Sequence, residues 1–280
     1  MIIDAHTHIC PPEIRAARSA FFKGEEDFAL LYEDPAARLI GADELVETLD
    51  AWGAISACAF GFPFNDDSKT RLVNDYVMAS AKARPGRVIP FVCVNPMRGA
   101  AAVKEVERCI ESGAKGIGEI ATYKAGMTKE VRDAIAPIAN IAAEADIPLL
   151  LHTNEPVGHS YPGKANISPE ETYALVKAHP ETKWILAHLG GGLFTYALLK
   201  REAPEVLKNV WYDTAAAPSL YRPEVYRAMR EAVGIEKIVY GSDYPLLPLE
   251  RYKTTLVAAG LSVEEQALVL GGNMAEVLGL

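Results

Sequence analysis

Short apolar runs rich in β-branched residues recur along the whole chain, and they constrain its fold more than any other feature. There are eight of them, at residues 1–5, 55–60, 88–94, 116–120, 147–151, 184–187, 210–212 and 237–240. The runs are continuously apolar rather than alternating, which is typical of strands that are buried on both faces. Strands of that kind belong to parallel sheets, so the sequence predicts an α/β fold.

The segments between these runs carry the signals of amphipathic helices. Ser168 with Glu171 forms a capping box, and Ser262 with Glu265 forms another. Eight alternations of strand and helix within 280 residues match the size of a closed barrel of parallel strands. We therefore expect a single (β/α)8 TIM barrel, and we expect residues 1–280 to form one domain.

The main alternative is an open, doubly wound sheet, which would favour a glycine-rich phosphate loop after the first strand. The first run ends instead in His6-Thr7-His8, and no GxGxxG or Walker motif is present.

One connection is longer than a minimal barrel needs, because residues 9–40 separate the first predicted strand from its helix. Long connections in compact domains tend to be functional, so we expect an extended loop that acts as a lid or a partner surface.

The charge balance and the cysteines narrow the class of protein. The net charge is −9, from 28 basic and 37 acidic residues, and this balance repels nucleic-acid phosphates and anionic membranes. No signal peptide or bilayer-spanning segment is visible, and the four cysteines form no CxxC pair. We expect a cytoplasmic protein that acts on a small molecule, with no nucleic-acid or membrane partner. Whether it forms a homo-oligomer is left open.

Chemically active side chains follow the apolar runs where the predicted strands end. They are His6, His8, Glu119, His152, His188, Asp213 and Asp243. In a barrel of parallel strands the carboxyl ends of all strands meet on one face, which is where barrel enzymes hold their chemistry. Residues far apart in the sequence are therefore expected to converge there. Asp4, on the same side of its strand as His6, either orients that ring or belongs to a buried network.

Four of these residues form a ligand set for a divalent metal. His6 and His8 are two residues apart on a strand, so both rings point to the same side. With His152 and Asp243 they make three imidazoles and one carboxylate, a donor set that suits Zn²⁺. Glu119 is a further candidate at the end of another predicted strand. Each residue alone could be a core histidine, a turn cap or a lysine partner, but their shared place at strand ends favours the metal site.

Two further groups are candidates for catalysis and substrate binding. The imidazole of His188, with an ordinary pKa of about 6.5, suits general acid–base catalysis; a histidine bonded to backbone at a strand end is the alternative. The loop at residues 153–164 is rich in donors, and its candidate substrate-binding residues are His159, Tyr161 and Lys164. We expect Lys164 and His159 to hold an anionic group, unless the loop is only solvated surface.

Several short motifs fall in an order and spacing that match one known group. They are Ile3-Asp4-Ala5-His6-Thr7-His8, Leu151-His152, Ala187-His188-Leu189-Gly190-Gly191, Tyr240-Gly241-Ser242-Asp243-Tyr244-Pro245 and Gly272-Asn273-Met274-Ala275. Over essentially the whole chain they resemble the amidohydrolase superfamily, and within it amidohydrolase family 2, which includes the aminocarboxymuconate-semialdehyde decarboxylase-like enzymes. The resemblance implies a metal-dependent barrel enzyme with His6, His8, His152 and Asp243 as ligands and His188 as catalytic acid or base.

One motif departs from that subgroup. Gly118-Glu119-Ile120 resembles instead the TatD-like hydrolases, in which this glutamate binds metal and a second ion can be present. The lysine of the fourth strand that is carboxylated to bridge two metals in other members is absent. The resemblance therefore leaves the number of metal ions open.

These observations predict a metal-dependent hydrolase that acts on a small carbonyl-containing substrate, such as a lactone, an amide or a related acid. In this interpretation a metal-activated water attacks the carbonyl carbon, Asp243 accepts its proton, and His188 polarises the substrate or protonates the leaving group. The alternative is a non-hydrolytic decarboxylase or hydratase that uses the same residues on an unsaturated carboxylic acid. A third hypothesis is a barrel that binds metal without catalysis.

Overall fold

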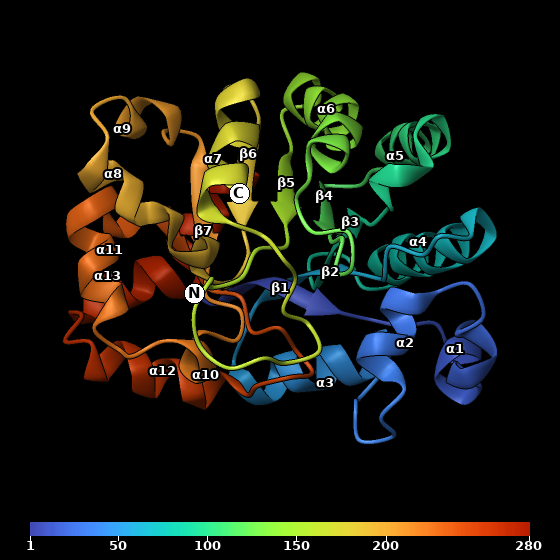
Figure 1. The fold of residues 1–280 in the computed structure, drawn as a ribbon. Coiled ribbons are helices and arrows are strands. Elements are labelled where there is room, and N and C mark those ends of the chain that lie inside the picture. Colours follow the sequence, from blue (N-terminus) through green and yellow to red (C-terminus); the bar gives the residue numbers. More distant parts are fainter.

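Eight parallel strands form one sheet in the computed structural model, which describes all of residues 1–280. The strands are β1 (Ile3–His8), β2 (Ser56–Phe60), β3 (Val88–Val92), β4 (Gly116–Ile120), β5 (Pro148–Leu151), β6 (Lys183–Leu186), β7 (Val210–Asp213) and β8 (Ile238–Val239). They pair in chain order, each parallel to its neighbour. Every predicted apolar run overlaps one strand, so the predicted (β/α)8 TIM barrel is confirmed (Figure 1).

The segment after β8 closes the barrel against β1. Strand β8 itself has only two residues, but the chain then continues beside β1. The Ala5 N–H donates to the Tyr240 carbonyl at 2.7 Å, and the Asp243 N–H donates to the His6 carbonyl at 3.0 Å. This closure brings Asp243, which follows the last strand, directly beside the end of the first strand.

Helices cover the outside of the barrel, as the alternating pattern predicts. The longer ones are α3 (Ala42–Trp52), α4 (Asp67–Ala83), α5 (Ala100–Glu111), α6 (Lys129–Glu144), α7 (Pro169–Ala178), α11 (Val225–Val233) and α12 (Leu249–Ala258). The shorter ones are α8 (Tyr196–Leu199), α9 (Ala203–Val206), α10 (Ala217–Leu220), α13 (Val263–Ala267) and α14 (Asn273–Leu278). Both predicted capping boxes are present, at the starts of α7 and α13. None of the helices combines the length and the apolarity that crossing a membrane requires.

Two apolar layers explain why the strands are apolar on both faces. One layer, which includes Trp184 and Ile135, lies between the strands and the surrounding helices. The other layer, which includes Phe91 and Leu150, fills the interior of the barrel, where Met274 of α14 packs against it. A polar side chain in the middle of a strand would be buried in one layer or the other. Polar groups are therefore concentrated at the strand ends.

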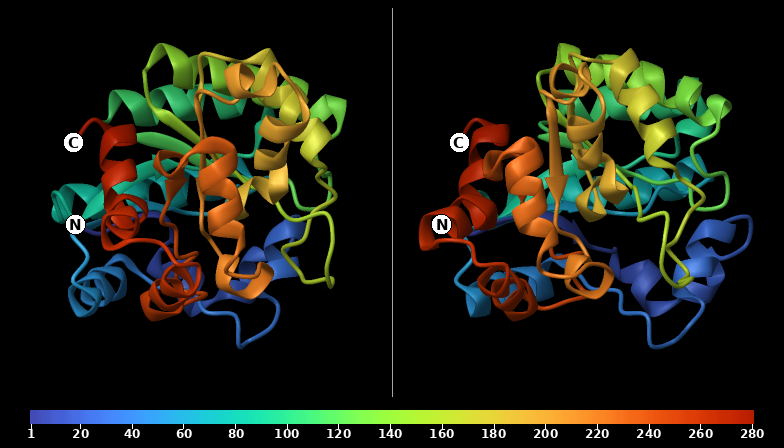
Figure 2. Two further views of the ribbon diagram at one scale, coloured as in Figure 1. Left: turned by 90° about the vertical axis from the view of Figure 1, so that its left-hand side faces the viewer. Right: turned by 60° about the vertical axis from the view of Figure 1, so that its left-hand side comes forward.

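The segment between β1 and α3 folds over the mouth of the barrel. It contains α1 (Pro12–Ala16) and α2 (Glu26–Tyr32), and Phe28 of α2 packs against Phe62 and Phe64, which follow β2. The two chain termini lie at the opposite end of the barrel from this segment and from the loop after β5 (Figure 2). The predicted extended loop after the first strand is thus present, at the end where the strands finish.

Candidate active site

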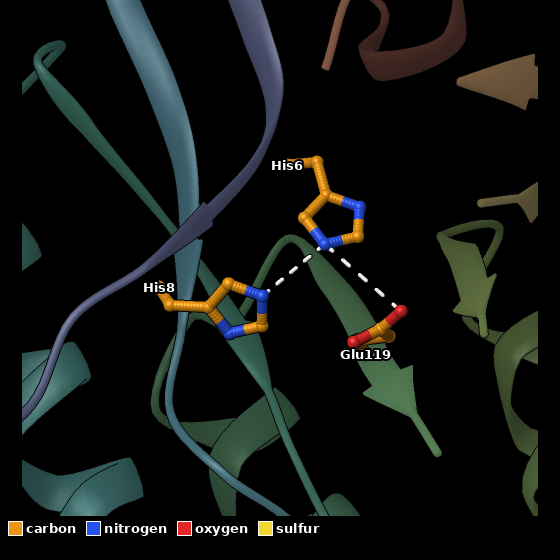
Figure 3. A group of neighbouring side chains, drawn as sticks. All are labelled: His6, His8 and Glu119. Carbon is orange, nitrogen blue, oxygen red and sulfur yellow. Dashed lines mark hydrogen bonds and ion pairs between the residues drawn. The ribbon is translucent and has the colours of Figure 1, made fainter. Parts of the chain in front are cut away.

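The strand-end residues converge on one face of the barrel, as predicted. His6 and His8 lie on β1, and their Nε2 atoms are 3.3 Å apart. Asp243, which follows β8, places Oδ1 3.2 Å from His8 Nε2 and 3.6 Å from His6 Nε2. Glu119 of β4 places Oε1 3.9 Å from His6 Nε2 (Figure 3). Four potential ligand atoms, from β1, from β4 and from the turn after β8, thus face one another.

His152, which follows β5, lies on the far side of Glu119 from the β1 histidines. Its Nδ1 is 2.9 Å from Glu119 Oε1, and its Nε2 is 3.0 Å from the carbonyl oxygen of Gly163. Both ring nitrogens therefore face acceptors. The predicted set of three histidines and Asp243 is not one compact group, because Glu119 lies between His152 and the rest. The reason is topological: β4 is the neighbour of β5 in the sheet.

Buried opposite charges set the ionisation of the two carboxyl groups. Burial alone would raise the pKa of Glu119, but the charges of His152 and His6 outweigh it and lower that pKa to about 2. Burial also opposes ionisation of Asp243, yet the hydrogen bond from His8 and the charge of His6 hold its pKa well below its ordinary range. Both groups are therefore carboxylates at neutral pH, which is the form that binds metal ions.

This arrangement of donors suits a divalent cation. Imidazole nitrogens and carboxylate oxygens are ligands of Zn²⁺, and carboxylates also suit Mn²⁺. Two ligands at about 2.0–2.1 Å from a tetrahedral ion lie roughly 3.3–3.4 Å from each other. The donor atoms of His6, His8 and Asp243 are separated by 3.3, 3.2 and 3.6 Å. A second group of possible ligands, Glu119 with His152 and His188, shares Glu119 with the first.

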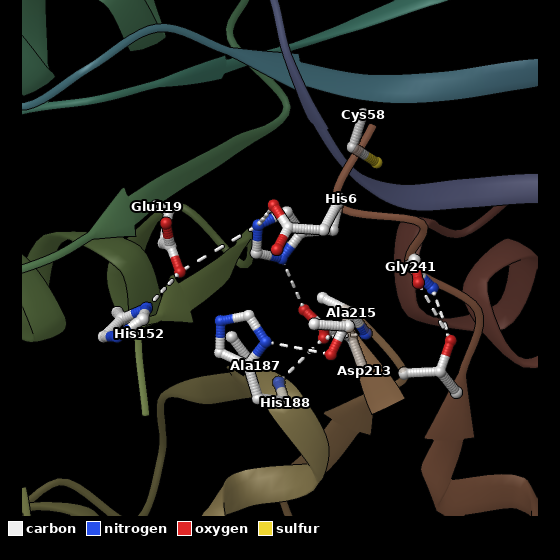
Figure 4. Close-up of polar contacts among 12 residues, drawn as sticks. His6, Cys58, Glu119, His152, Ala187, His188, Asp213, Ala215 and Gly241 are labelled. Carbon is white, nitrogen blue, oxygen red and sulfur yellow. Dashed lines mark hydrogen bonds and ion pairs between the residues drawn. The ribbon is translucent and has the colours of Figure 1, made fainter. Parts of the chain in front are cut away.

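His188 presents one ring nitrogen to the site and ties the other to the backbone. Its Nδ1 lies 2.9 Å from the Ala215 carbonyl (Figure 4). A carbonyl only accepts, so Nδ1 carries the proton and Nε2 of the neutral ring keeps its lone pair. Burial and the neighbouring His152 lower the pKa of His188. His188 and Asp243 both adopt left-handed backbone conformations, with φ of 54° and 56°, and such strain in residues other than glycine is typical of functional sites.

Asp213, at the end of β7, is a site residue for which the sequence predicted no role. Its Oδ2 lies 2.8 Å from His6 Nδ1, so Asp213 rather than Asp4 orients that ring. Asp4 Oδ1 accepts instead from the backbone N–H groups of His6, at 3.1 Å, and Ser242, at 2.9 Å. Of the two roles left open for Asp4, the buried network is therefore the one it has. The only sequence signal for Asp213 was its place at a strand end.

The cluster of strand-end residues opens into a cavity of about 560 Å³. Aromatic and aliphatic side chains form much of its wall, among them Leu31, Tyr32, Phe62, Tyr123, Leu220 and Leu247. Arg38, from the segment between β1 and α3, also lines it. The guanidinium carbon of Arg38 lies 5.6 Å from the centre of the Tyr244 ring, and the group pairs with Glu44. Sequence reasoning missed Arg38 because no motif or strand end marks it.

The loop after β5 contributes His159 and Tyr161 to the cavity, but Lys164 does not line it. The Lys164 ammonium donates to Glu155 Oε1 and to the Val157 carbonyl, both at 2.8 Å. The Tyr161 hydroxyl donates to the other Glu155 oxygen, also at 2.8 Å. The structure therefore corrects the expected place of Lys164, because its charge is used to fold the loop around a buried glutamate.

The comparison with known proteins agrees with this geometry. The sequence matches the model of one protein family, described as "Amidohydrolase", over residues 3–280. The chain belongs to the amidohydrolase family. As an amidohydrolase it also resembles the solved structure of 5-carboxyvanillate decarboxylase from Sphingomonas paucimobilis, with a TM-score of 0.76 and 17% identity. That match covers 100% of this chain and 99% of the other.

Two further solved structures resemble this amidohydrolase over its whole length. A variant of 5-carboxyvanillate decarboxylase from Novosphingobium aromaticivorans, with bound manganese and 3-methoxy-4-hydroxy-5-nitrobenzoic acid, has a TM-score of 0.77 and 17% identity, covering 100% of this chain and 97% of that one. A dihydroxybenzoic acid decarboxylase from Polaromonas, with bound manganese and the inhibitor 2-nitroresorcinol, has a TM-score of 0.69 and 17% identity, with the same coverage of 100% and 97%.

These neighbours contradict the reaction that the sequence analysis favoured for this amidohydrolase. It predicted a hydrolase, whereas all three structures are decarboxylases, which supports the alternative interpretation instead. Strand-end imidazoles and carboxylates can serve either reaction, so the motifs could not separate them. A divalent metal site fits both the family and the cluster of His6, His8 and Glu119. Zinc is not confirmed, because two of the neighbours hold manganese.

Proposed function

We propose that this amidohydrolase is a metal-dependent decarboxylase of a small aromatic or unsaturated carboxylic acid. The observation that carries the proposal is the lining of the cavity, which combines the cluster of strand-end imidazoles and carboxylates with aromatic and aliphatic side chains that form much of the wall. A flat acid fits such a cavity with its polar groups at the cluster and its carbon skeleton against the apolar side chains. The similar solved structures are enzymes for 5-carboxyvanillate and dihydroxybenzoic acid.

We assign the metal to His6, His8 and Asp243, with Glu119 as a further ligand. His152 stays in the proposed ligand set as the fifth residue, and to bind the ion one of its ring nitrogens must leave its contact with Glu119 or with the Gly163 carbonyl. A divalent ion bound there acts as a Lewis acid toward oxygen atoms of the substrate. The contribution of the chain is to hold the donor atoms at fixed separations in a largely buried site. The metal is Zn²⁺ or Mn²⁺, and elemental analysis of protein purified without chelators identifies it.

The reaction also needs a group that handles a proton. When the bond between the carbon skeleton and the carboxylate breaks, its electron pair stays on the carbon, and that carbon must gain a proton. Nε2 of His188 is suited to carry this proton, because Nδ1 is already held by the Ala215 carbonyl. Asp243 also lines the cavity and is the second candidate. The proton comes from solvent and ends on the product carbon, while CO₂ departs.

Release of CO₂ from candidate acids tests the reaction. We expect the metal-loaded protein to release CO₂ from one or more hydroxybenzoic or unsaturated carboxylic acids, and the metal-stripped protein to be inactive. In ²H₂O the product should carry one deuterium at the carbon that lost the carboxylate. Turnover of lactones or amides without any CO₂ release, by the same preparation, would refute the proposal.

Arg38 is proposed to hold an anionic group of the substrate in the role that the sequence analysis gave to Lys164, with His159 and Tyr161 beside it. Arg38→Met keeps the length and the apolar stem but removes the charge. A hydrogen bond to a charged group contributes about 1.5–3 kcal/mol, so we expect KM to rise roughly 10–100-fold, with a smaller change in kcat. Arg222→Met, which removes an exposed arginine that pairs with Glu224 and does not line the cavity, is the control and should leave KM unchanged. An unaltered KM in Arg38→Met would show that the arginine lines the cavity without binding the substrate.

We also place the enzyme in the cytoplasm, because all four cysteines are free thiols, the state that this compartment maintains. We further propose that residues 1–280 act as one domain, since the site combines β1 with the turn after β8.

A further inference from the structure

Asp213 contacts two histidines on different strands, and we infer that it is the positioning residue that makes both of them present Nε2 to the site. Its side chain is fully buried. Oδ2 accepts from His6 Nδ1 at 2.8 Å, and Oδ1 accepts from the backbone N–H groups of His188, at 3.1 Å, and Ala215, at 2.9 Å (Figure 4). Both carboxylate oxygens are therefore used within the protein.

The contact with Asp213 fixes where His6 carries its proton. A carboxylate only accepts hydrogen bonds, so Nδ1 of His6 must be the protonated nitrogen. Nε2 of the neutral ring then keeps its lone pair, and Nε2 is the atom that faces His8 at 3.3 Å and Asp243 at 3.6 Å. With the proton on Nε2 instead, His6 would have no lone pair to offer a metal. Asp213 thus decides whether His6 can be a ligand.

The same segment holds His188. Asp213 Oδ1 fixes the backbone N–H of His188, and the Ala215 carbonyl, two residues further on, fixes its Nδ1. These contacts hold His188 at a φ of 54°, which is uncommon for residues other than glycine. Asp213 therefore sets the tautomer of His6 directly, and Asp213 and the Ala215 carbonyl together hold the backbone and the ring of His188.

The packing at Gly241 makes this arrangement specific. A Cβ added to Gly241 would lie 2.8 Å from the Cβ of His6 and 3.3 Å from the Cβ of Asp213. A glycine at this position therefore leaves the space in which the His6 and Asp213 side chains meet.

Asp213→Asn tests the inference with almost no change in shape. The amide oxygen can accept from the two backbone N–H groups, but its NH₂ then faces His6 Nδ1. Two donors cannot share a hydrogen bond, so Nδ1 must lose its proton and Nε2 must take it. At a pH where the His6 ring of the metal-free protein carries a single proton, we expect ¹⁵N NMR to show that proton on Nδ1 in the wild-type protein and on Nε2 in Asp213→Asn. Metal affinity, measured against a competing chelator with Zn²⁺ or Mn²⁺, should fall about 10–100-fold.

Two internal controls separate this role from general damage. His188 keeps its Ala215 contact in Asp213→Asn, so its Nδ1 proton should stay. Thr182→Val removes a buried hydroxyl outside the site that bonds only to the Ala139 carbonyl, and it should preserve both the His6 tautomer and the metal affinity. A wild-type His6 without a proton on Nδ1 overturns the inference even if the Asn variant does not fold. An Asn variant with unchanged tautomer and affinity overturns it too.

The affinity measurement rests on the proposed function, because it assumes that His6 binds the metal, whereas the NMR measurement does not. If the protein turned out to release no CO₂, the NMR result would be unaffected. If instead Asp213 had no positioning role, the tautomer would be unchanged while decarboxylation could still be observed. The two failures are therefore distinguishable.

Discussion

His6→Ala is expected to lose tight metal binding and, with it, all measurable activity. The Nε2 atom of His6 lies within 3.3 to 3.9 Å of donor atoms on His8, Asp243 and Glu119, so it is the ligand that the others surround. Its removal leaves the ligand atoms of His8, Asp243 and Glu119 without the central member of the set. Elemental analysis and chelator competition measure the metal, and CO₂ release measures the activity.

His8→Ala is the matched comparison, because the two histidines differ in what lies behind them. His6 is fully buried and its Nδ1 is paired with Asp213, whereas His8 is partly exposed and has no buried carboxylate behind it. Loss of His6 therefore leaves a buried acceptor unpaired, which costs about 1–3 kcal/mol. We expect both variants to lose metal, but only His6→Ala to show a clear decrease in the free energy of unfolding. Full metal content in either variant would mean that these residues do not form the site.

The barrel could be predicted from the sequence because its strands are buried on both faces. That burial makes the runs continuously apolar, so each one is visible without any tertiary information. The same burial drives polar groups to the strand ends, which is why the sequence alone places His6, His8 and Asp243 on one face. The helix ends were visible for a local reason, since a capping box such as Ser168 with Glu171 lies within four residues.

The contacts between the site residues could not be predicted from the sequence in this way. Glu119 lies between His152 and the β1 histidines because of the order of strands around the barrel and the direction of each side chain. Lys164 is a cation in a loop beside the site, but whether it faces the cavity depends on a buried partner, Glu155, that the sequence does not mark. Arg38 lies in a long segment without periodicity, so only the folded chain shows that it lines the cavity.

The reaction was the least predictable feature. Hydrolysis and decarboxylation both use a divalent metal, a group that carries a proton and a place for a carboxylate or carbonyl oxygen. What separates them is the surface against which the rest of the substrate lies, and that surface is built from residues such as Tyr32 and Leu247 that carry no motif. The pattern of metal-ligand residues therefore predicts that the enzyme uses a metal, but it does not predict which bond of the substrate breaks.

His188→Asn is expected to keep the fold and the metal but to lower kcat by roughly 10²–10⁴-fold, the usual contribution of general acid–base catalysis. Asparagine is chosen because it tolerates the left-handed backbone of this position better than most residues. It cannot carry a proton as imidazole does. His179→Asn, at the end of α7 and bonded to Asn140, is the control, and it should leave the rate unchanged.

The competing role for His188 is that of a ligand to a second ion, because Glu119, His152 and His188 also form a group with metal-ligand geometry. The two roles differ in how many ions the protein holds. If His188 carries a proton, the wild-type protein and His188→Asn bind the same number of ions per chain, close to one. If His188 is a ligand, the wild type binds two and the variant fewer. The expected result is an unchanged count with a large loss of rate, since the Nδ1–H of His188 is held by backbone and its Nε2 faces the cavity where a substrate carbon must be protonated. A fall from two ions to one would assign His188 to the metal and leave Asp243 as the group that handles the proton.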